Sequence, residues 1–225
     1  MPPGLAHTGL TMAATELPLF PLNTVLFPGG DLPLQIFEVR YLDLMQRCER
    51  EGQPFGVVTL RSGQEVRRAP GAPGAAAPAE TLADVGTLAH LTQVVRPQAG
   101  LMFVMARGGQ RFKLEAARQL PHGLWMGDVA LLPDDVVVPL PDELAELGPR
   151  LRTLLQTIER AEGLPTPIPE ADDACWQQAG WVANRWAERL PLLPPDRLRL
   201  MQLDNPVWRL ELVAEWVDQL VRRQA

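Results

Sequence analysis

Residues 20–41, FPLNTVLFPGGDLPLQIFEVRY, interrupt apolar sequence with three prolines and a glycine pair, and this pattern strongly restricts the fold. Proline lacks the amide donor that a central strand needs, so we expect the apolar pieces to form edge strands or strand ends. Phe27-Pro28-Gly29-Gly30 predicts a tight reversal, because proline fixes one φ angle and glycine readily adopts a positive one. The segment is therefore predicted to hold two short strands joined by a turn.

The spacing of apolar residues changes directly after this segment. They recur three and four positions apart, which predicts a helix over residues 38–51. Its buried face would hold Tyr41, Leu44, Met45 and Cys48, and its polar face Arg40, Asp43, Arg47 and Arg50. This helix is predicted to cap the first strands, with Cys48 as a core thiol.

Further strands are predicted up to residue 132. Short apolar runs separated by turn signals cover residues 54–60, 85–95, 101–107, 110–119 and 124–132, a spacing typical of an antiparallel sheet or small barrel. Within QRFKLEA, Phe112, Leu114 and Ala116 alternate with Arg111, Lys113 and Glu115. This alternation predicts that the three charged side chains face solvent.

Helical spacing takes over after Pro133. One stripe is formed by Leu144, Leu147, Leu151, Leu154 and Ile158, and a second by Trp176, Ala179, Ala183, Trp186 and Leu190. A last helix is predicted to begin at the N-cap Asn205 with Pro206 in its first position, and to turn Trp208, Leu212, Val213, Trp216 and Leu220 inward. The chain is thus predicted to be α+β, with a disordered tail over 1–15, a β-barrel-like subdomain over 16–132 and a helical subdomain over 133–225.

The charge distribution suggests two subdomains of different character, and the lack of a targeting segment favours a cytoplasmic protein. The net charge is −6, and the whole acidic excess lies after residue 132, because residues 16–132 hold eleven acidic and eleven basic residues. The first fifteen residues carry no lysine or arginine and no long apolar run, so neither a secretory signal nor contact with a membrane is expected. Cys48 and Cys175 are far apart in the sequence and predict no disulfide framework.

Motifs for catalysis, cofactors and metals are missing. The single serine, Ser62, and the single lysine, Lys113, fall on a predicted turn and a solvent-facing strand position, which disfavours a Ser–Lys dyad. The sequence contains no phosphate-binding glycine motif, and its three histidines are scattered. We therefore expect no cofactor and no metal site.

Four segments together resemble the amino-terminal substrate-binding domain of the ATP-dependent Lon protease family, most strongly its bacterial stand-alone versions. They are ELPLFPLNTVLFPGGDLPLQIFEVRY (16–41), FGVV (55–58), VGTLAHLTQV (85–94) and GGQRFKLE (108–115). The motif residues are Phe20, Pro21, Phe27, Pro28, Gly29, Gly30, Phe37, Glu38, Arg40 and Tyr41. Stand-alone members typically have proline where this chain has Val39, which leaves the start of the helix less rigid.

The resemblance implies a fold and a function. The fold would be a PUA-like β-barrel or pseudobarrel with one capping helix, followed by a helical bundle. The function would be binding of unfolded or tagged polypeptides, or of another protein, without catalysis, because the motifs of the family's ATPase and peptidase modules are missing from this chain. An adaptor in protein quality control would fit these properties.

Two sets of side chains are candidates for the binding surface. Phe20, Phe27, Phe37 and Tyr41 are predicted to form the seam between strands and helix, since large aromatic side chains are usually buried. Methionines beside aromatic residues make adaptable surfaces, so Met102, Met105, Trp125 and Met126 are the peptide-binding candidates, although core packing would also explain them.

Two other functions remain open at this stage. A PUA-like barrel could bind RNA through a basic strip of Arg96, Arg107, Arg111, Lys113 and Arg118, against which the acidic net charge argues. An unrecognised hydrolase is the third possibility, for which the sequence offers no constellation of residues. The client and the oligomeric state are not specified by the sequence.

Overall fold

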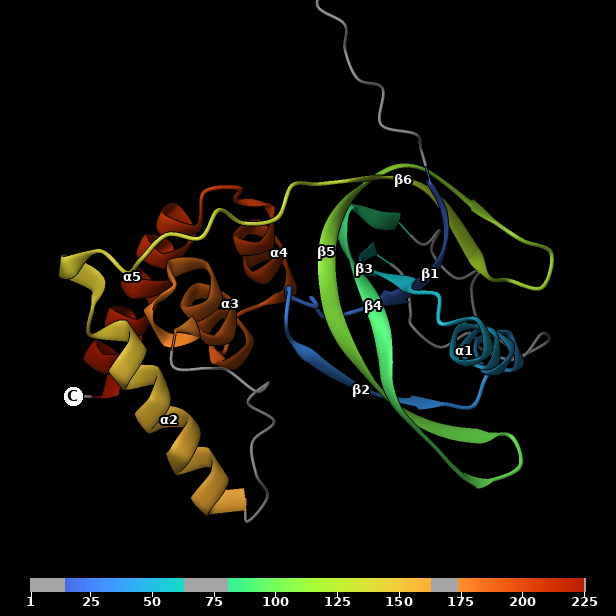
Figure 1. Ribbon diagram of the computed structural model, residues 1–225, viewed down its shortest axis with the longest axis horizontal. Helices are drawn as coiled ribbons and strands as arrows, with labels where there is room; N and C mark the ends of the chain where they lie inside the picture. The colour runs from blue at the N-terminus through green and yellow to red at the C-terminus, as the bar shows by residue number, and fades with distance from the viewer. Residues whose placement is uncertain (1–14, 63–80, 163–173, 225) are drawn as a thin grey trace, which may run out of the picture.

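The computed structural model describes residues 15–62, 81–162 and 174–224, which form a mixed α+β structure. The strands are β1 (Thr15–Leu22), β2 (Asp31–Ile36), β3 (Phe55–Ser62), β4 (Thr81–Gln98), β5 (Leu101–Gln119) and β6 (Trp125–Leu131). The helices are α1 (Val39–Glu51), η1 (Asp142–Leu144), α2 (Leu147–Glu162), η2 (Cys175–Gln177), α3 (Ala179–Arg189), α4 (Pro194–Gln202) and α5 (Pro206–Gln224). Strands with α1 lie on one side and the other helices on the opposite side (Figure 1). The α+β prediction is confirmed, while most of the predicted 1–15 tail lies outside the described residues.

The strands form one six-stranded sheet in the order β2-β5-β4-β3-β1-β6. An additional pairing joins β5 to β6, so β5, β4, β3, β1 and β6 pair in a closed circuit. Strands β1 and β3 are parallel, and the other pairs are antiparallel. Among the described strands β2 pairs with β5 alone, so it is an edge strand (Figure 1).

The prolines of β1 lie where the strand has a single neighbour. Residues 15–19 pair with β6, and residues 19–22 pair with β3. Pro18 therefore faces β6 across the ladder, and Pro21 faces β3, and no second described strand pairs with either. A missing amide donor is tolerated at such positions.

The predicted reversal at residues 27–30 is present. Gly29 has a φ of 72°, and the Gly30 amide donates to the Phe27 carbonyl at 3.0 Å. Gly108 of β5 fastens the turn, because its carbonyl accepts from Gly29 at 2.7 Å and its amide donates to Gly30 at 2.8 Å. The close approach explains the glycine at 108, where a Cβ atom would overlap the Phe27 carbonyl oxygen.

Gly108 also explains an error in the sequence prediction. Residues 101–107 and 110–119 were expected to be separate strands, but β5 continues through both glycines as one strand of 19 residues. Gly108 serves close packing against the 27–30 turn, and the neighbouring Gly109 lies close to His90 of β4, so neither glycine makes a chain reversal. The length of β5 lets it pair with β2 through its first half and with β6 through its second.

Helix α1 buries the face that the sequence predicts. Tyr41, Leu44, Met45 and Cys48 are all at most 5% exposed. The Tyr41 ring lies 4.1 Å from that of Phe20, which confirms these two residues as part of the seam between helix and strands. Burial raises the pKa of the Cys48 thiol above its usual range, as expected of a core cysteine.

Two motif residues beside α1 differ from prediction. Arg40 was expected on the polar face but is only 8% exposed. Its guanidinium donates to the Gly123 carbonyl at 2.7 Å and pairs with Glu38 at 2.9 Å. Phe37 is 51% exposed and does not belong to the buried seam. Ile36, which is 1% exposed, takes the inward position at the end of β2, and Phe37 follows the strand in the connection to α1.

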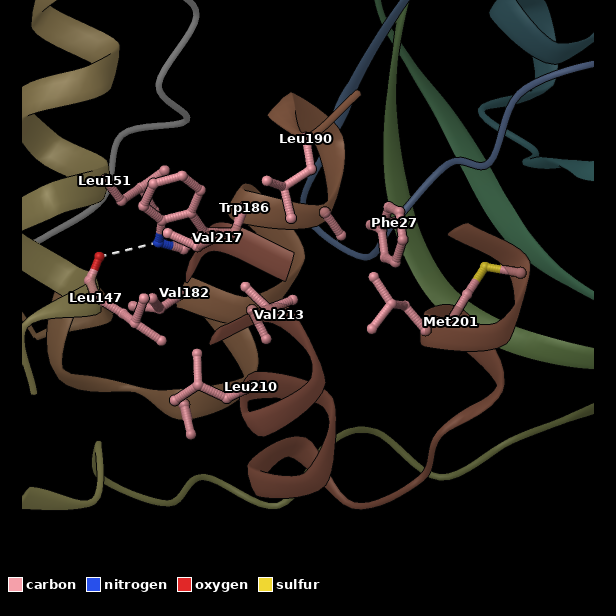
Figure 2. Packing of buried hydrophobic residues seen from close by; sticks show 14 of the residues in the cluster. Phe27, Leu147, Leu151, Val182, Trp186, Leu190, Met201, Leu210, Val213 and Val217 are labelled. Carbon is pink, nitrogen blue, oxygen red and sulfur yellow. Dashed lines mark hydrogen bonds between the residues drawn. The ribbon is translucent and has the colours of Figure 1, made fainter. Parts of the chain in front are cut away.

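A hydrophobic cluster joins the helices to the strands (Figure 2). The predicted stripe of Trp176, Ala179, Ala183, Trp186 and Leu190 is buried, although it runs through η2, α3 and the residue after α3 instead of one helix. The Trp186 indole donates to the Leu147 carbonyl at 2.9 Å and so links α3 to α2. Phe27, which is 0% exposed, lies beside Met201 and belongs to this cluster, so the core continues from the helices into the β1–β2 connection.

Helix α5 begins as predicted, with Asn205 as its N-cap. The Asn205 side-chain oxygen accepts from the Val207 amide at 2.9 Å and the Trp208 amide at 3.4 Å. Trp208 was expected inside but is 62% exposed, because Arg209, which is 1% exposed, occupies the inward position. Helix α4 was not predicted. No helix among the described residues has the length and apolar character needed to cross a membrane.

Replacing Asn205 with alanine is expected to lower the free energy of unfolding by about 1 kcal/mol, since two amides of the first turn lose their acceptor. Urea denaturation followed by circular dichroism measures the change. Asn205→Asp keeps an acceptor and should retain most of the stability. A loss for Asn205→Asp as large as for Asn205→Ala would show that the cap does not stabilise α5.

Candidate functional site

A shallow apolar hollow lies on the face formed by β2, β5 and β4. Phe103 of β5 stands at its centre, opposite Gln35 of β2 and Val95 of β4 in the strand register. Phe103 is 44% exposed and Val95 47% exposed, which is unusual for large apolar side chains on neighbouring strands. We name this the outer hollow, of about 330 Å³, lined by Pro33, Leu34, Gln35, Gln93, Val95, Phe103, Val104 and Met105.

The outer hollow lies beside the open edge of β2. An edge strand presents backbone groups that can pair with a further extended chain, while alternate side chains of that chain enter neighbouring pockets. Pro33 removes one donor from β2 but leaves its carbonyl oxygens. The arrangement can therefore hold an extended polypeptide by backbone pairing and by burial of apolar side chains.

A second hollow adjoins the first and reaches the helices. We name it the junction hollow, of about 320 Å³, lined by Thr24, Val25, Leu26, Gly30, Asp31, Leu32, Pro33, Met105, Glu188, Arg189 and Arg197. Pro33 and Met105 line both hollows, so the two are neighbours along β2.

The two acids of the junction hollow have arginine partners. Asp31 accepts two hydrogen bonds from Arg107, at 2.9 and 3.3 Å. Glu188 accepts two from Arg185, at 2.8 and 2.6 Å. Burial raises the pKa of Glu188, and the adjacent Arg185 guanidinium opposes this rise.

The four peptide-binding candidates do not share one surface. Met102 is 2% exposed and belongs to the core cluster beneath α1, against which Met126 also packs. Trp125 packs against a third cluster around Leu19. Met105 is the one of the four that lines the two hollows described above.

The sequence prediction missed Phe103 and Val95. The alternation of side chains along β5 could have indicated Phe103, because Met102, Val104 and Ala106 point to one face and are buried whereas Phe103 points to the other and is exposed. Alternation separates the two faces of a strand but does not say which face remains uncovered.

The basic residues considered for RNA binding are mostly paired with acids. Arg96 pairs with Glu49, Arg107 with Asp31 and Arg118 with Glu16. Arg111 was expected to face solvent and is instead 4% exposed, because its guanidinium donates to the Met201 carbonyl at 2.8 Å and pairs with Asp204 at 3.2 Å. The candidate strip is thus largely neutralised, and RNA binding is not favoured.

Ser62 and Lys113 are separated along the sheet. Ser62 pairs with Thr81 of β4, and Lys113 pairs with Val85, four positions further along the same strand. Four residues of strand span about 13 Å, so the two positions are not neighbours in the sheet. In the part of the chain that the structure describes, no group of three or more His, Cys, Asp or Glu residues is placed to hold a metal ion.

Comparison with known families gives a match over nearly the whole chain. A family model described as the ATP-dependent protease La (LON) substrate-binding domain matches residues 16–219. The chain belongs to this Lon substrate-binding domain family. The resemblance inferred from the motif residues is thus confirmed, and membership supports a role in substrate recognition.

Two bacterial Lon proteases align with this Lon substrate-binding domain. Lon protease from Anaeromyxobacter dehalogenans is 35% identical over 206 residues, and Lon protease 2 from Myxococcus xanthus is 26% identical over 225 residues. The alignments cover 90% and 97% of this chain but 23% and 26% of the two proteases. The matched region is therefore about a quarter of each relative.

Two solved structures share the fold. The Lon N-terminal domain protein from Xanthomonas campestris is 33% identical with a TM-score of 0.67, and the match covers 90% of this chain and 98% of that one. The N-terminal domain of the Mycobacterium avium complex Lon protease is 18% identical with a TM-score of 0.57, covering 91% and 98%. The second comparison supports the fold alone.

Proposed function

We propose that this Lon substrate-binding domain is a non-enzymatic module that binds extended segments of unfolded or tagged polypeptides. The observation that carries the proposal is the exposed outer hollow beside the edge strand β2, in a member of a substrate-binding family. An aromatic side chain of the client would lean across Gln35 towards Phe103 and bury part of its surface there, while the client backbone would pair with β2. Met105 is retained as a binding residue in this proposal.

The proposal extends to organisation and cellular role. The closed circuit of strands within residues 16–132 would be the PUA-like pseudobarrel, with α1 as its cap, and residues 133–225 would form the helical bundle. The protein would act in the cytoplasm as an adaptor in protein quality control. Capture of the same unfolded clients by this chain and by a separate protease would support the adaptor role.

Replacing Phe103 with serine is expected to weaken binding of an unfolded polypeptide by roughly tenfold, because central aromatic residues dominate the binding energy of such surfaces. The measurement is fluorescence anisotropy of a labelled, reduced and carboxymethylated protein titrated with each variant. Phe103 is already 44% exposed, so the substitution should leave the melting temperature nearly unchanged.

A matched control removes an exposed aromatic side chain elsewhere. Trp208 is 62% exposed on α5 and lines neither hollow, so Trp208→Ser should leave the affinity unchanged. Equal affinities of the Phe103→Ser and wild-type proteins would rule out the outer hollow as the binding surface. No binding of any unfolded polypeptide at tens of micromolar would rule out the function.

A further inference from the structure

Two arginines without a salt bridge line the junction hollow. Arg189, the last residue of α3, and Arg197 of α4 both line it, and neither forms a salt bridge within the described residues. The two acids of the lining, Asp31 and Glu188, form their salt bridges with arginines outside the lining, Arg107 and Arg185, although the charge of Arg189 also acts on Glu188. Arg189 and Arg197 are therefore the charged groups of the hollow that can take a further acidic partner.

Arg197 is held in position by its own helix connection. Its Nη2 atom donates to the Leu190 carbonyl at 3.1 Å, and its Nε atom is buried without a hydrogen-bond partner. The bond to Leu190 fixes the guanidinium at the wall of the hollow, so binding costs less side-chain entropy here than at a free surface arginine. The arrangement suits a carboxylate, which a guanidinium binds by charge-assisted hydrogen bonds.

The distance between the two hollows follows from the register of β2. Gln35 lines the outer hollow and Asp31 lines the junction hollow, with Pro33 shared between them. Four residues of extended chain cover about 13 Å. A polypeptide lying along β2 with an apolar side chain near Phe103 would therefore bring the side chain about four positions away to Arg189 and Arg197.

We propose that the junction hollow binds an acidic side chain of the client, so that preferred segments carry Asp or Glu about four residues from an apolar anchor. This inference rests on the proposed function and specifies its substrate class. Both hollows lie open at the surface, so the client can continue past them, and we assign the carboxylate to a side chain within the segment rather than to a chain end. Charge complementarity with Arg189 and Arg197 selects the acid, and the outer hollow selects the anchor.

The test uses three fluorescent twelve-residue peptides with the same Phe-Leu anchor. The first carries Glu four positions from the anchor on both sides and has blocked ends. The second has Gln at these positions, and the third has the same Gln residues but ends in a free carboxylate at that spacing. Anisotropy titrations use the wild-type full chain, Arg189→Gln, Arg189→Gln/Arg197→Gln and Phe103→Ser. Arg199→Gln, an exposed position on the same helix α4, is the charge-matched control.

The Glu peptide should bind wild-type protein about fivefold more tightly than the Gln peptide, a size typical of a partly buried ion pair. This preference should disappear in the double variant, fall to about twofold in Arg189→Gln and persist in Arg199→Gln. Because the Arg189 side chain is exposed, the single variant tests the proposal even where the double variant does not fold. Rising salt should reduce the preference in the wild-type protein.

The outcomes separate this inference from the proposed function. Equal binding of the Glu and Gln peptides, with both weakened by Phe103→Ser, would overturn the acidic-client inference and leave the polypeptide-binding function intact. A preference shown only by the peptide with a free terminal carboxylate would overturn the assignment to a side chain. Failure of all three peptides to bind, or indifference to Phe103→Ser, would overturn the proposed function and this inference with it.

Discussion

Replacing Arg209 with methionine is expected to lower the free energy of unfolding by about 3–5 kcal/mol, the usual loss when one partner of a buried ion pair is removed. The Arg209 side chain is 1% exposed and donates to both oxygens of Asp135, at 2.5 and 3.0 Å. It also donates to the Asn184 side chain at 3.0 Å and to the carbonyls of Leu200 and Leu203. The variant removes these bonds and leaves Asp135 with the more distant Arg111 guanidinium at 3.6 Å, which is why the loss exceeds that of a surface contact.

Urea denaturation monitored by tryptophan fluorescence measures the change, with Arg150→Met as the control. Arg150 pairs with Asp218 at 3.6 Å, but the two side chains are 38% and 57% exposed, and such a pair contributes at most about 1 kcal/mol. A second variant, Arg209→Met/Asp135→Asn, also removes the carboxylate that has lost its nearer arginine, and it should recover part of the loss. Equal losses for Arg209→Met and Arg150→Met would contradict a stabilising role for the buried network.

The same network shows why strand alternation predicted β5 only in part. Alternation placed Phe112 inside and Lys113 outside correctly, yet Arg111 is buried. Its guanidinium lies 3.6 Å from Asp135 and reaches the Met201 carbonyl, so residues from the helical half cover a strand face that an isolated sheet would expose to water. Periodicity within a strand contains no information about what a later segment of the chain will place against it.

The start of α5 and the buried face of α1 were predictable because their signals are local. The Asn205-Pro206 pair and the apolar face of α1 each depend on residues within two turns of the same helix. Buried arginines were not predictable, because their hydrogen-bond partners lie far away in the sequence. Arg40 finds its acceptor at Gly123, 83 positions away in the sequence, and it was placed outside because charged residues are usually exposed.

The candidate site shows the same limit. Alternation in residues 101–107 separates Met102 from Phe103, but the sequence does not reveal that β2 is an edge strand and leaves the Phe103 face uncovered. The prediction therefore selected methionines by type, and of these Met105 lines the hollows. The charge of the predicted basic strip was misjudged for the same reason. Glu49 pairs with Arg96 and Glu16 pairs with Arg118, and both acids come from segments distant in the sequence.

Replacing Phe27 with alanine is expected to destabilise the protein by about 3–5 kcal/mol, the range found for phenylalanine truncation in a packed core. Phe27 is 0% exposed and joins the helical cluster from the β1–β2 connection (Figure 2). The backbone around it is fixed by the Gly29 and Gly30 bonds to Gly108 and by an Arg185 bond to the Pro28 carbonyl at 2.9 Å. Because these bonds hold the connection in place, the site can collapse little around the cavity, which favours the upper part of the range.

Phe37→Ala is the matched control, because it is the same substitution in the same sequence motif. Phe37 is 51% exposed, so its truncation should change the free energy of unfolding by less than about 1 kcal/mol. Thermal denaturation measures both effects. The melting temperature should fall by roughly 10 °C for Phe27→Ala and by a few degrees at most for Phe37→Ala. The contrast tests the connection directly, because a small loss for Phe27→Ala would mean that the helices do not depend on the turn at residues 27–30 for their attachment to the sheet.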